Sequence, residues 1–260
     1  MTATLLTCLY AGDDSTHFKK YLKDVCENSA FLEAVIIVVD GPLPTTLDKL
    51  IKQVDKDPLF KIIWLETNQG LVNALNSGLK ACTSKFCIRL DPDDRMRKNR
   101  VKRVLEEFNA GDVDVVFNGV EIVDDYDTKI RSDTPIDNLI FYRNPYYHSG
   151  SAYNVAAIRK IGGYRPFSGF EDYDLWLRAN KHGLSTKIIP EDLSSFRLST
   201  QTIGRRAGLK YFWYEVIFMK TSFMERNLPL KFLPFWVLRL ASRLLPKFFI
   251  VKLRSYYFKL

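Results

Sequence analysis

The residues best suited to chemistry lie in one short stretch, where an apolar run meets three carboxylates. Phe86–Leu90 has the composition of a buried strand, and Asp91, Asp93 and Asp94 follow it around Pro92. Proline cannot continue the hydrogen bonding of a central strand, so the strand should end here. Carboxylates this close repel one another unless a cation or strong donors lie among them. A Mg²⁺ or Mn²⁺ site for substrate phosphates would meet that need, whereas a solvated turn that caps the next helix is the structural alternative.

A second carboxylate stands at the end of the clearest strand in the sequence. Residues 34–39 are β-branched on both faces, as a central parallel strand should be, and Asp40 follows them before Gly41 and Pro42. Ligands of open α/β sheets bind at the carboxyl ends of the strands. Asp40 and Asp91 should therefore face one crevice, although an Asp before Gly-Pro is also a common turn residue.

The elements that must position these residues alternate along the first half of the chain. Hydrophobic periodicity predicts strands at 3–10, 34–39, 60–65, 86–90 and 113–118, with helices at 15–28, 45–54, 71–82 and 95–108. This alternation predicts a mainly parallel sheet with helices on both faces. The sequence has no GxGxxG after the first strand and no Walker A motif, which argues against a dinucleotide-binding Rossmann domain and a P-loop nucleotidase.

The middle of the chain is less regular. Short strands are expected at 120–123, 151–156, 187–190 and 195–198, and the polar segment 124–133 is expected to be an exposed loop or hairpin. His148 lies in a polar, aromatic loop. Glu171 and Asp172 open a helical pattern that contains Trp176, and acids at this place complement the helix dipole.

Taken together, these stretches resemble family 2 glycosyltransferases of the GT-A fold, especially bacterial enzymes that build O-antigen, capsule and other surface polysaccharides. Each motif alone is weakly specific, but the set follows the family's order from the first strand to about the last one. The matching stretches are Val38–Leu43, Asn68–Leu71 with Ala74–Asn76, Arg89–Asp94, Asn144–Pro145 with His148, Gly162–Tyr164 and Phe170–Trp176.

The resemblance implies a fold and a domain organisation. The fold would be a GT-A-type, Rossmann-like α/β/α sandwich with a mainly parallel central sheet. Residues 1–208 would form the glycosyltransferase domain, with a nucleotide-sugar-binding half at about 1–120 and an acceptor-binding, catalytic half at about 121–208. The motifs do not cover the last sixty residues; from their own composition, residues 209–260 are expected to form an amphipathic, basic, helical C-terminal region.

The resemblance also implies roles for single residues. Asp40 would accept a hydrogen bond from the uracil ring of a UDP-sugar, Asp91 would lie near the ribose, and Asp93 would hold the Mn²⁺ or Mg²⁺ that bridges the diphosphate. Asp172 matches the family's catalytic base. Further residues expected at the site are Tyr10, Gly70, Asn73 and Arg205 on the nucleotide side, with Asp94, His148, Glu171 and Trp176 on the acceptor side or beside it. Without the resemblance, His148 could be structural, and Glu171 and Asp172 could simply begin a helix.

The implied reaction is transfer of a hexose or N-acetylhexosamine from a UDP-sugar to a hydroxyl of a lipid-diphosphate-linked saccharide. With a single base, the acceptor hydroxyl that it activates attacks opposite the leaving group and inverts the configuration, so an α-linked donor would yield a β-glycoside. Two alternatives are a sugar-nucleotide-binding protein without transfer activity and a nucleotidyltransferase. The second is weakened because no Gly- and Arg-rich phosphate loop follows the first strand.

The positive charge of the chain is concentrated at its end. The net charge is +8, yet no acidic residue follows Glu225, and the seven basic residues within 229–260 leave about +1 for the rest. Arg239, Arg243 and Lys247 share one stripe of a predicted helix at 235–245. This pattern indicates a helix lying on an anionic membrane, at the cytoplasmic inner face, with packing on the domain as the alternative. Nucleic acid is not expected as a partner, because no reading motif accompanies the charge.

The remaining composition bounds the compartment. The four cysteines show no CxxC or CxxH spacing and lie in or beside apolar segments, so buried thiols in a reducing compartment are expected. The chain lacks an uncharged apolar stretch of about 18 residues, so no membrane-spanning helix is expected. Its first residues lack a basic region, so no signal peptide is expected either.

Overall fold

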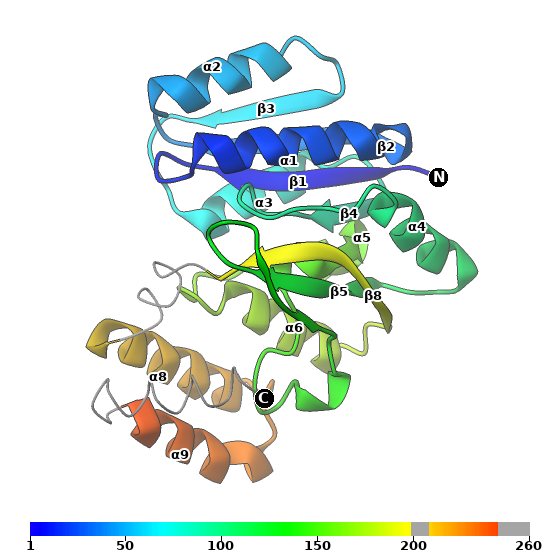
Figure 1. Cartoon of the computed structure of the whole chain (residues 1–260). Coiled ribbons are helices and arrows are strands. Elements are labelled where there is room, and N and C mark those ends of the chain that lie inside the picture. Colours follow the sequence, from blue (N-terminus) through cyan, green and yellow to red (C-terminus); the bar gives the residue numbers. More distant parts are fainter. Residues whose placement is uncertain (199–207, 244–260) are drawn as a thin grey trace.

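A computed structural model describes residues 1–198 and 208–243 (Figure 1). The strands are β1 (Ala3–Leu9), β2 (Leu32–Asp40), β3 (Phe60–Leu65), β4 (Phe86–Arg89), β5 (Val115–Val123), β6 (Lys129–Asp133), β7 (Ser151–Asn154) and β8 (Thr186–Arg197). The helices are α1 (Ser15–Asn28), α2 (Thr45–Val54), α3 (Leu71–Ala81), α4 (Arg100–Ala110), α5 (Val155–Lys160), α6 (Glu171–Lys181), α8 (Leu209–Met224) and α9 (Leu233–Arg243).

One sheet of eight strands organises the molecule, in the order β3-β2-β1-β4-β7-β5-β6 with β8 paired to β5. The first four strands are mutually parallel, and β8 runs parallel to β5. Strands β6 and β7 are antiparallel to their neighbours. The predicted α/β sandwich with a mainly parallel sheet is therefore confirmed, and β1, β2 and β4 end at the same edge.

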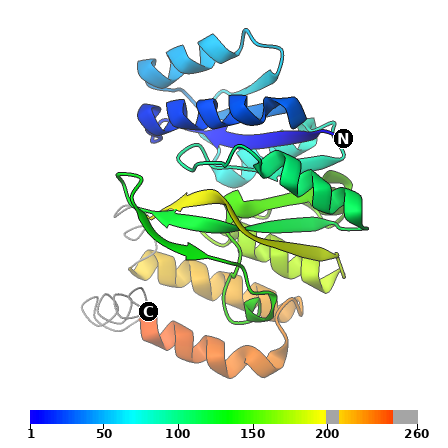
Figure 2. The ribbon, with the colours of Figure 1, turned by 45° about the vertical axis from the view of Figure 1, so that its right-hand side comes forward.

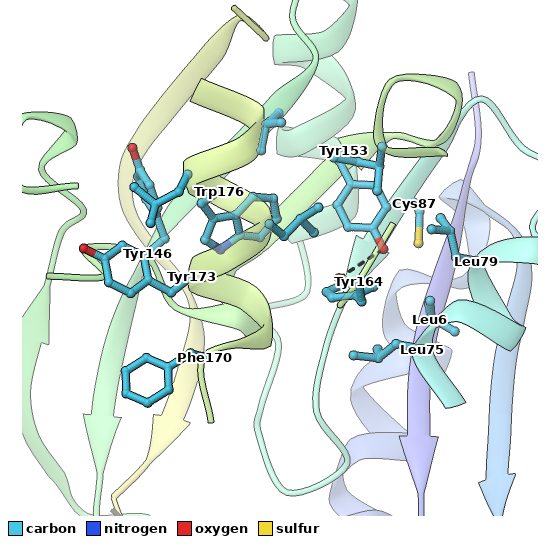
Figure 3. Close-up of a cluster of buried hydrophobic side chains, with 14 of the residues drawn as sticks. Leu6, Leu75, Leu79, Cys87, Tyr146, Tyr153, Tyr164, Phe170, Tyr173 and Trp176 are labelled. Atoms are coloured by element: carbon cyan, nitrogen blue, oxygen red, sulfur yellow. Dashed lines mark hydrogen bonds between the residues drawn. The ribbon is translucent and has the colours of Figure 1, made fainter. Parts of the chain in front are cut away.

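Both faces of the sheet are covered by helices, as Figures 1 and 2 show. One apolar cluster joins the sheet to α1, α2 and α4 through residues such as Phe18, Leu47 and Val104. The other joins it to α3, α5 and α6, and also to α8 and α9 through Phe218 and Trp236. Figure 3 shows part of the second cluster, which is rich in aromatic rings. The C-terminal helices thus share a core with the sheet.

Two pairs of predicted short strands are in fact two long strands. β5 runs without a break through Gly119, and β8 runs through Pro190, with the register between them shifting at Gly119. A Cβ at Gly119 would lie 2.7 Å from the Pro190 carbonyl oxygen, so only glycine fits this close approach. Glycine and proline interrupt the sequence pattern, but a bulge accommodates both within the ladder.

Helix α4 begins five residues later than the predicted start at Arg95. The Arg95 N–H donates to Ser195 Oγ at 2.9 Å, and Met96 forms a bridge with Ser194 of β8. The Arg95 guanidinium pairs with Asp24 of α1 at 2.6 Å. Tertiary contacts therefore keep residues 95–97 out of the helix, and a turn at residues 98–99 leads into α4, which the sequence alone does not indicate.

The C-terminal helices correct the interpretation of the basic stripe. Arg239 and Arg243 of α9 both pair with the fully buried Glu215 of α8, at 2.5 and 2.8 Å. The indole of Trp236 is buried and donates to the Phe141 carbonyl oxygen at 2.9 Å. These arginines face α8, not outward, because Glu215 precedes the acid-free end of the chain in sequence but lies beside it in the fold. Lys247 lies outside the described residues.

The structure also bears on the cysteines and on membrane-spanning helices. Cys8, Cys82 and Cys87 are buried free thiols, but Cys26 is exposed, because the buried face of α1 runs through Tyr21 and Val25 instead. In residues 1–198 and 208–243, no helix has the length and apolar character that crossing a bilayer requires.

Candidate active site

The carboxylate of Asp91 lies just past the end of β4 and is held by two partners. Ser149 Oγ donates to it at 3.1 Å and accepts the Asp91 N–H at 3.0 Å, and the Arg89 guanidinium forms an ion pair with it. Burial raises the pKa of Asp91, but Arg89, His148 and Ser149 outweigh burial and bring the pKa below its ordinary value. Asp91 is therefore a fixed anion at the edge of the sheet.

Arg89 is the functional residue that the sequence analysis missed. Its side chain is fully buried; it bonds the Leu6 carbonyl oxygen and pairs with Asp91. Its Nε donates to His148 Nε2 at 3.2 Å, and the Tyr164 hydroxyl lies 2.9 Å from the same nitrogen. The sequence feature that could have indicated this role is an arginine at the end of the otherwise apolar strand β4.

His148 acts here as an acceptor. A guanidinium can only donate, so Nε2 must be unprotonated and the ring proton must lie on Nδ1. Burial and the neighbouring Arg89 lower the pKa of His148 to about 3. His148 is therefore a neutral imidazole that orients Arg89. This is a structural role, which was the alternative to contact with the acceptor.

Asp93 and Asp94 differ in accessibility. Asp94 is 2% exposed, and its carboxylate accepts the N–H of Arg197 at 2.9 Å. Burial and repulsion from Asp93 and Asp91 raise the pKa of Asp94 well above its ordinary value. Burial and Asp91 also raise the pKa of Asp93, which remains partly exposed. The Arg197 guanidinium donates to the Asp93 carbonyl oxygen at 3.2 Å and so holds the loop from behind.

The acidic loop can accommodate a hard divalent cation through one residue. Within the described part of the chain, no three His, Cys, Asp or Glu side chains are grouped so that they alone could hold a metal ion. Asp91 is paired with Arg89 and Asp94 is almost inaccessible, which leaves Asp93 as the carboxylate best placed to reach one. Mg²⁺ and Mn²⁺ bound with substrate phosphates and water need only one or two protein carboxylates, so this donor set fits.

Asp40 closes the turn that leads into α3. Its two carboxylate oxygens accept the N–H groups of Gln69, at 2.7 Å, and Gly70, at 2.9 Å, and the residue is 4% exposed. Gly70 has φ +85°, a left-handed conformation that favours glycine. Asn73, which is exposed in the first turn of α3, donates to the Gln69 carbonyl oxygen at 2.9 Å. Each oxygen of Asp40 can accept a second hydrogen bond, which leaves room for the expected contact with a nucleobase. That contact stays a prediction.

Asp172 lies in the first turn of α6, beside Glu171, and both are partly exposed. Asn144 Nδ2 donates to one oxygen of Asp172 at 2.8 Å, and the Tyr173 N–H donates to the other at 2.7 Å. These two donors fix the direction of the carboxylate. Asn144 was noticed only as part of a motif; the structure shows it as the orienting partner of Asp172.

Tyr164 lies between the two groups of carboxylates. Its hydroxyl contacts His148, and the Asp172 charge, after burial, is among the causes that raise the pKa of Tyr164. Asn76 of α3 clamps this segment, because it donates to the Tyr164 carbonyl oxygen at 2.8 Å and accepts the Tyr164 N–H at 3.0 Å. The acidic loop and the start of α6 therefore belong to one region.

Three other predicted site residues have different outcomes. Tyr10 follows β1 at the same sheet edge and is 37% exposed. Trp176 is 2% exposed and lies in the aromatic core against Phe117, which corrects its expected place beside an acceptor (Figure 3). Its position on the inner face of α6, one turn beyond Asp172, explains the difference. Arg205 lies outside the described residues.

Comparisons with known proteins agree with this geometry. The family profile "Glycosyl transferase family 2" matches residues 16–168. The chain is 32% identical, over 80% of its own length and 78% of the relative's, to a UDP-Gal:alpha-D-GlcNAc-diphosphoundecaprenol beta-1,3-galactosyltransferase of Escherichia coli. It is 24% identical to the amylovoran biosynthesis glycosyltransferase AmsE of Erwinia amylovora, over 94% of each chain.

A solved structure shows the same fold. TarS of S. aureus, residues 1–349 in complex with UDP-GlcNAc, superposes with a TM-score of 0.66 at 15% identity. The match covers 84% of this chain and spans 65% of the TarS chain. The family profile covers more than half of the sequence and the acidic loop, the Asp40 turn and most of the sheet lie within it. This chain belongs to the family 2 glycosyltransferases.

Proposed function

We propose that this glycosyltransferase moves a hexose or N-acetylhexosamine from a UDP-sugar to a hydroxyl of a lipid-diphosphate-linked saccharide, with inversion to a β-glycosidic bond. The observation that carries the proposal is that one segment holds two of the candidate carboxylates: Asn144 donates to Asp172, and Ser149 donates to Asp91, two residues before Asp93. The Escherichia coli relative, whose name states a UDP-Gal donor and a diphosphoundecaprenol-linked acceptor, supports the substrate class. The setting is bacterial polysaccharide synthesis at the inner face of the membrane.

The two carboxylates would divide the chemistry. Asp172, which Asn144 and the Tyr173 N–H orient, would take the proton of the acceptor hydroxyl as that oxygen attacks the anomeric carbon. Mn²⁺ or Mg²⁺, when bound at Asp93, supplies neutralisation of the charge on the departing diphosphate. Asp91 and Arg89 give the loop a fixed shape, so the donor would be bound in one orientation.

The test is turnover with a panel of UDP-sugars and a GlcNAc-diphospho-lipid acceptor, in Mn²⁺, Mg²⁺ or EDTA. Asp172→Asn should lower the turnover rate about 10²- to 10⁴-fold and leave UDP-sugar binding intact, because a general base contributes on that order. Asp48→Asn, which changes an acid in the first turn of α2 outside the site, is the matched control and should retain most activity. The product linkage should be β by NMR.

Particular outcomes would point elsewhere. Tight UDP binding without turnover on any acceptor would favour the sugar-nucleotide-binding alternative. Formation of a UDP-sugar from UTP and a sugar phosphate would favour a nucleotidyltransferase. Unchanged turnover in Asp172→Asn would remove this residue from the base role.

A further inference from the structure

The side of α8 opposite its buried face is apolar and exposed. Leu209, Trp213, Ile217 and Met224 recur at helical spacing and are 71%, 59%, 55% and 73% exposed. The opposite side, represented by Phe218, is fully buried. We call these four residues the α8 apolar stripe. Helix α9 and the turn before it continue this character with exposed Leu230, Val237 and Leu238.

The exposed charges around the α8 apolar stripe are mostly positive. Lys210, Lys220, Arg226 and Lys231 are exposed on α8 or on the segment that joins it to α9. Glu225 is the exposed acid in the described part of this region, and it is ion-paired with Arg165 at 2.9 Å. The surface therefore combines large apolar side chains with more positive than negative side chains.

We propose that the α8 apolar stripe and its surrounding lysines dock this chain on a lipid bilayer that contains anionic lipid. A bilayer interface offers apolar depth for Trp213 and Ile217 and phosphate groups for Lys210 and Lys220. A second copy of the chain packed stripe to stripe would instead bring the lysines of both copies together, where like charges repel. Charge complementarity thus favours the bilayer.

The position of α8 gives docking a use, which rests on the proposed lipid-linked acceptor. Phe218 of α8 stacks on Phe170 at a ring distance of 4.8 Å, and Phe170 directly precedes α6 with Glu171 and Asp172. The α8 apolar stripe lies on the other side of the same helix, roughly 10 Å from the side that carries Phe218. A bilayer held there would present the headgroup of an acceptor lipid beside the candidate base.

Vesicle sedimentation of the full chain tests the surface. The probes are vesicles of mixed phosphatidylglycerol and phosphatidylcholine and vesicles of phosphatidylcholine alone. Trp213→Ser/Ile217→Ser should lower the partition coefficient about tenfold or more, because both side chains lose their apolar contact with the interface. Trp64→Ser, on the 47% exposed tryptophan of β3, is the matched control and should bind as the parent does.

Charge and depth can be read separately. Lys210→Gln/Lys220→Gln should lower binding about fivefold for each lysine, and only on the anionic vesicles. In a Trp64→Phe background Trp213 is the exposed tryptophan, because Trp176 and Trp236 are buried. Its emission should shift to shorter wavelength when anionic vesicles are added.

Undiminished binding of Trp213→Ser/Ile217→Ser would overturn the proposal, as would a parent dimer in light scattering that this variant dissociates. The turnover assay in detergent keeps the two proposals apart. If docking is correct, the variant transfers sugar normally to detergent-dispersed acceptor and poorly to acceptor in vesicles. If vesicle binding behaves as expected but no variant or parent transfers sugar, the proposed function fails and the docking surface stands.

Discussion

The Asp91 carboxylate depends on contacts with residues far away in the sequence. Ser149 is 58 positions from Asp91, and His148, which accepts from Arg89, is 59 positions from it. The acidic motif could be predicted from the sequence because its residues are adjacent. Its partners could not, because nothing local in Ser149 or His148 indicates which strand end they will face.

The ion pair between Arg89 and Asp91 should be tightly coupled energetically. Arg89→Met leaves a largely enclosed carboxylate without its cation and should lower the free energy of unfolding by about 3 kcal/mol in urea titrations. Adding Asp91→Asn should recover part of this loss, because the unpaired charge disappears. Strictly additive effects in this double-mutant cycle would contradict the coupling. Arg103→Met, which breaks the surface pair with Glu107, should cost less than about 1 kcal/mol.

The neutral state of His148 has a consequence for acid stability. Its pKa is about 3 when folded, below the ordinary value of 6.5, so between these values the unfolded chain binds more protons. Stability should therefore fall as the pH drops from 6.5 toward 3. His148→Gln lacks this proton uptake, so its stability relative to the parent should improve by about 3 kcal/mol between pH 6.5 and 4. Parallel stability curves over that range would show that His148 does not titrate in this way.

At the scale of single elements, the entry to α3 depends on one backbone conformation. Gly70→Ala should lower the free energy of unfolding by about 1 to 2 kcal/mol, since φ is +85° there and no neighbouring atom lies within 4 Å of a new Cβ. The cost is thus backbone strain alone. Gly111→Ala is the matched control, because its Cβ would meet only Val113 at 3.9 Å and its backbone is extended. A loss as large at Gly111 would refute the conformational explanation.

Asp40 stabilises the same turn from the end of β2. Asp40→Ala should cost about 1 to 2 kcal/mol, because the N–H groups of Gln69 and Gly70 lose their acceptor. Thermal unfolding measures this cost, and UDP binding measured in parallel separates a structural role from contact with the nucleobase. A stable Asp40→Ala variant that no longer binds UDP would assign the residue to the ligand alone.

The elements that the sequence predicts best are those with clear periodicity. The bounds of α1, α2 and β3 agree with their predicted ranges, since amphipathic spacing and turn residues mark both ends. Helix α8 lies within the C-terminal region that was expected to be helical, but its bounds could not be predicted, because Tyr211, Phe218 and Trp213 place aromatic residues on its buried and exposed sides alike. Such a helix gives no apolar stripe that contrasts with a polar one.

At the scale of the whole molecule, Glu215 joins the C-terminal helices to the domain. Glu215→Gln leaves Arg239 and Arg243 without their buried counter-charge and should lower the free energy of unfolding by about 3 kcal/mol. Hydrogen exchange should also accelerate in α9. Glu225→Gln, an exposed acid of the same region, should cost less than about 1 kcal/mol, and equal effects of the two changes would contradict the buried role of Glu215.

The sheet order also governs how the chain can fold during synthesis. Strand β7 pairs with Cys87 of β4 on one side and with Val116 of β5 on the other, so in the described part of the sheet β7 is the strand that joins β4 to β5. A ribosome-bound chain that ends near residue 120 holds four parallel strands whose β4 edge has no neighbour yet. That open edge must wait until Asn154 leaves the exit tunnel, and only then do the two halves of the enzyme become one sheet.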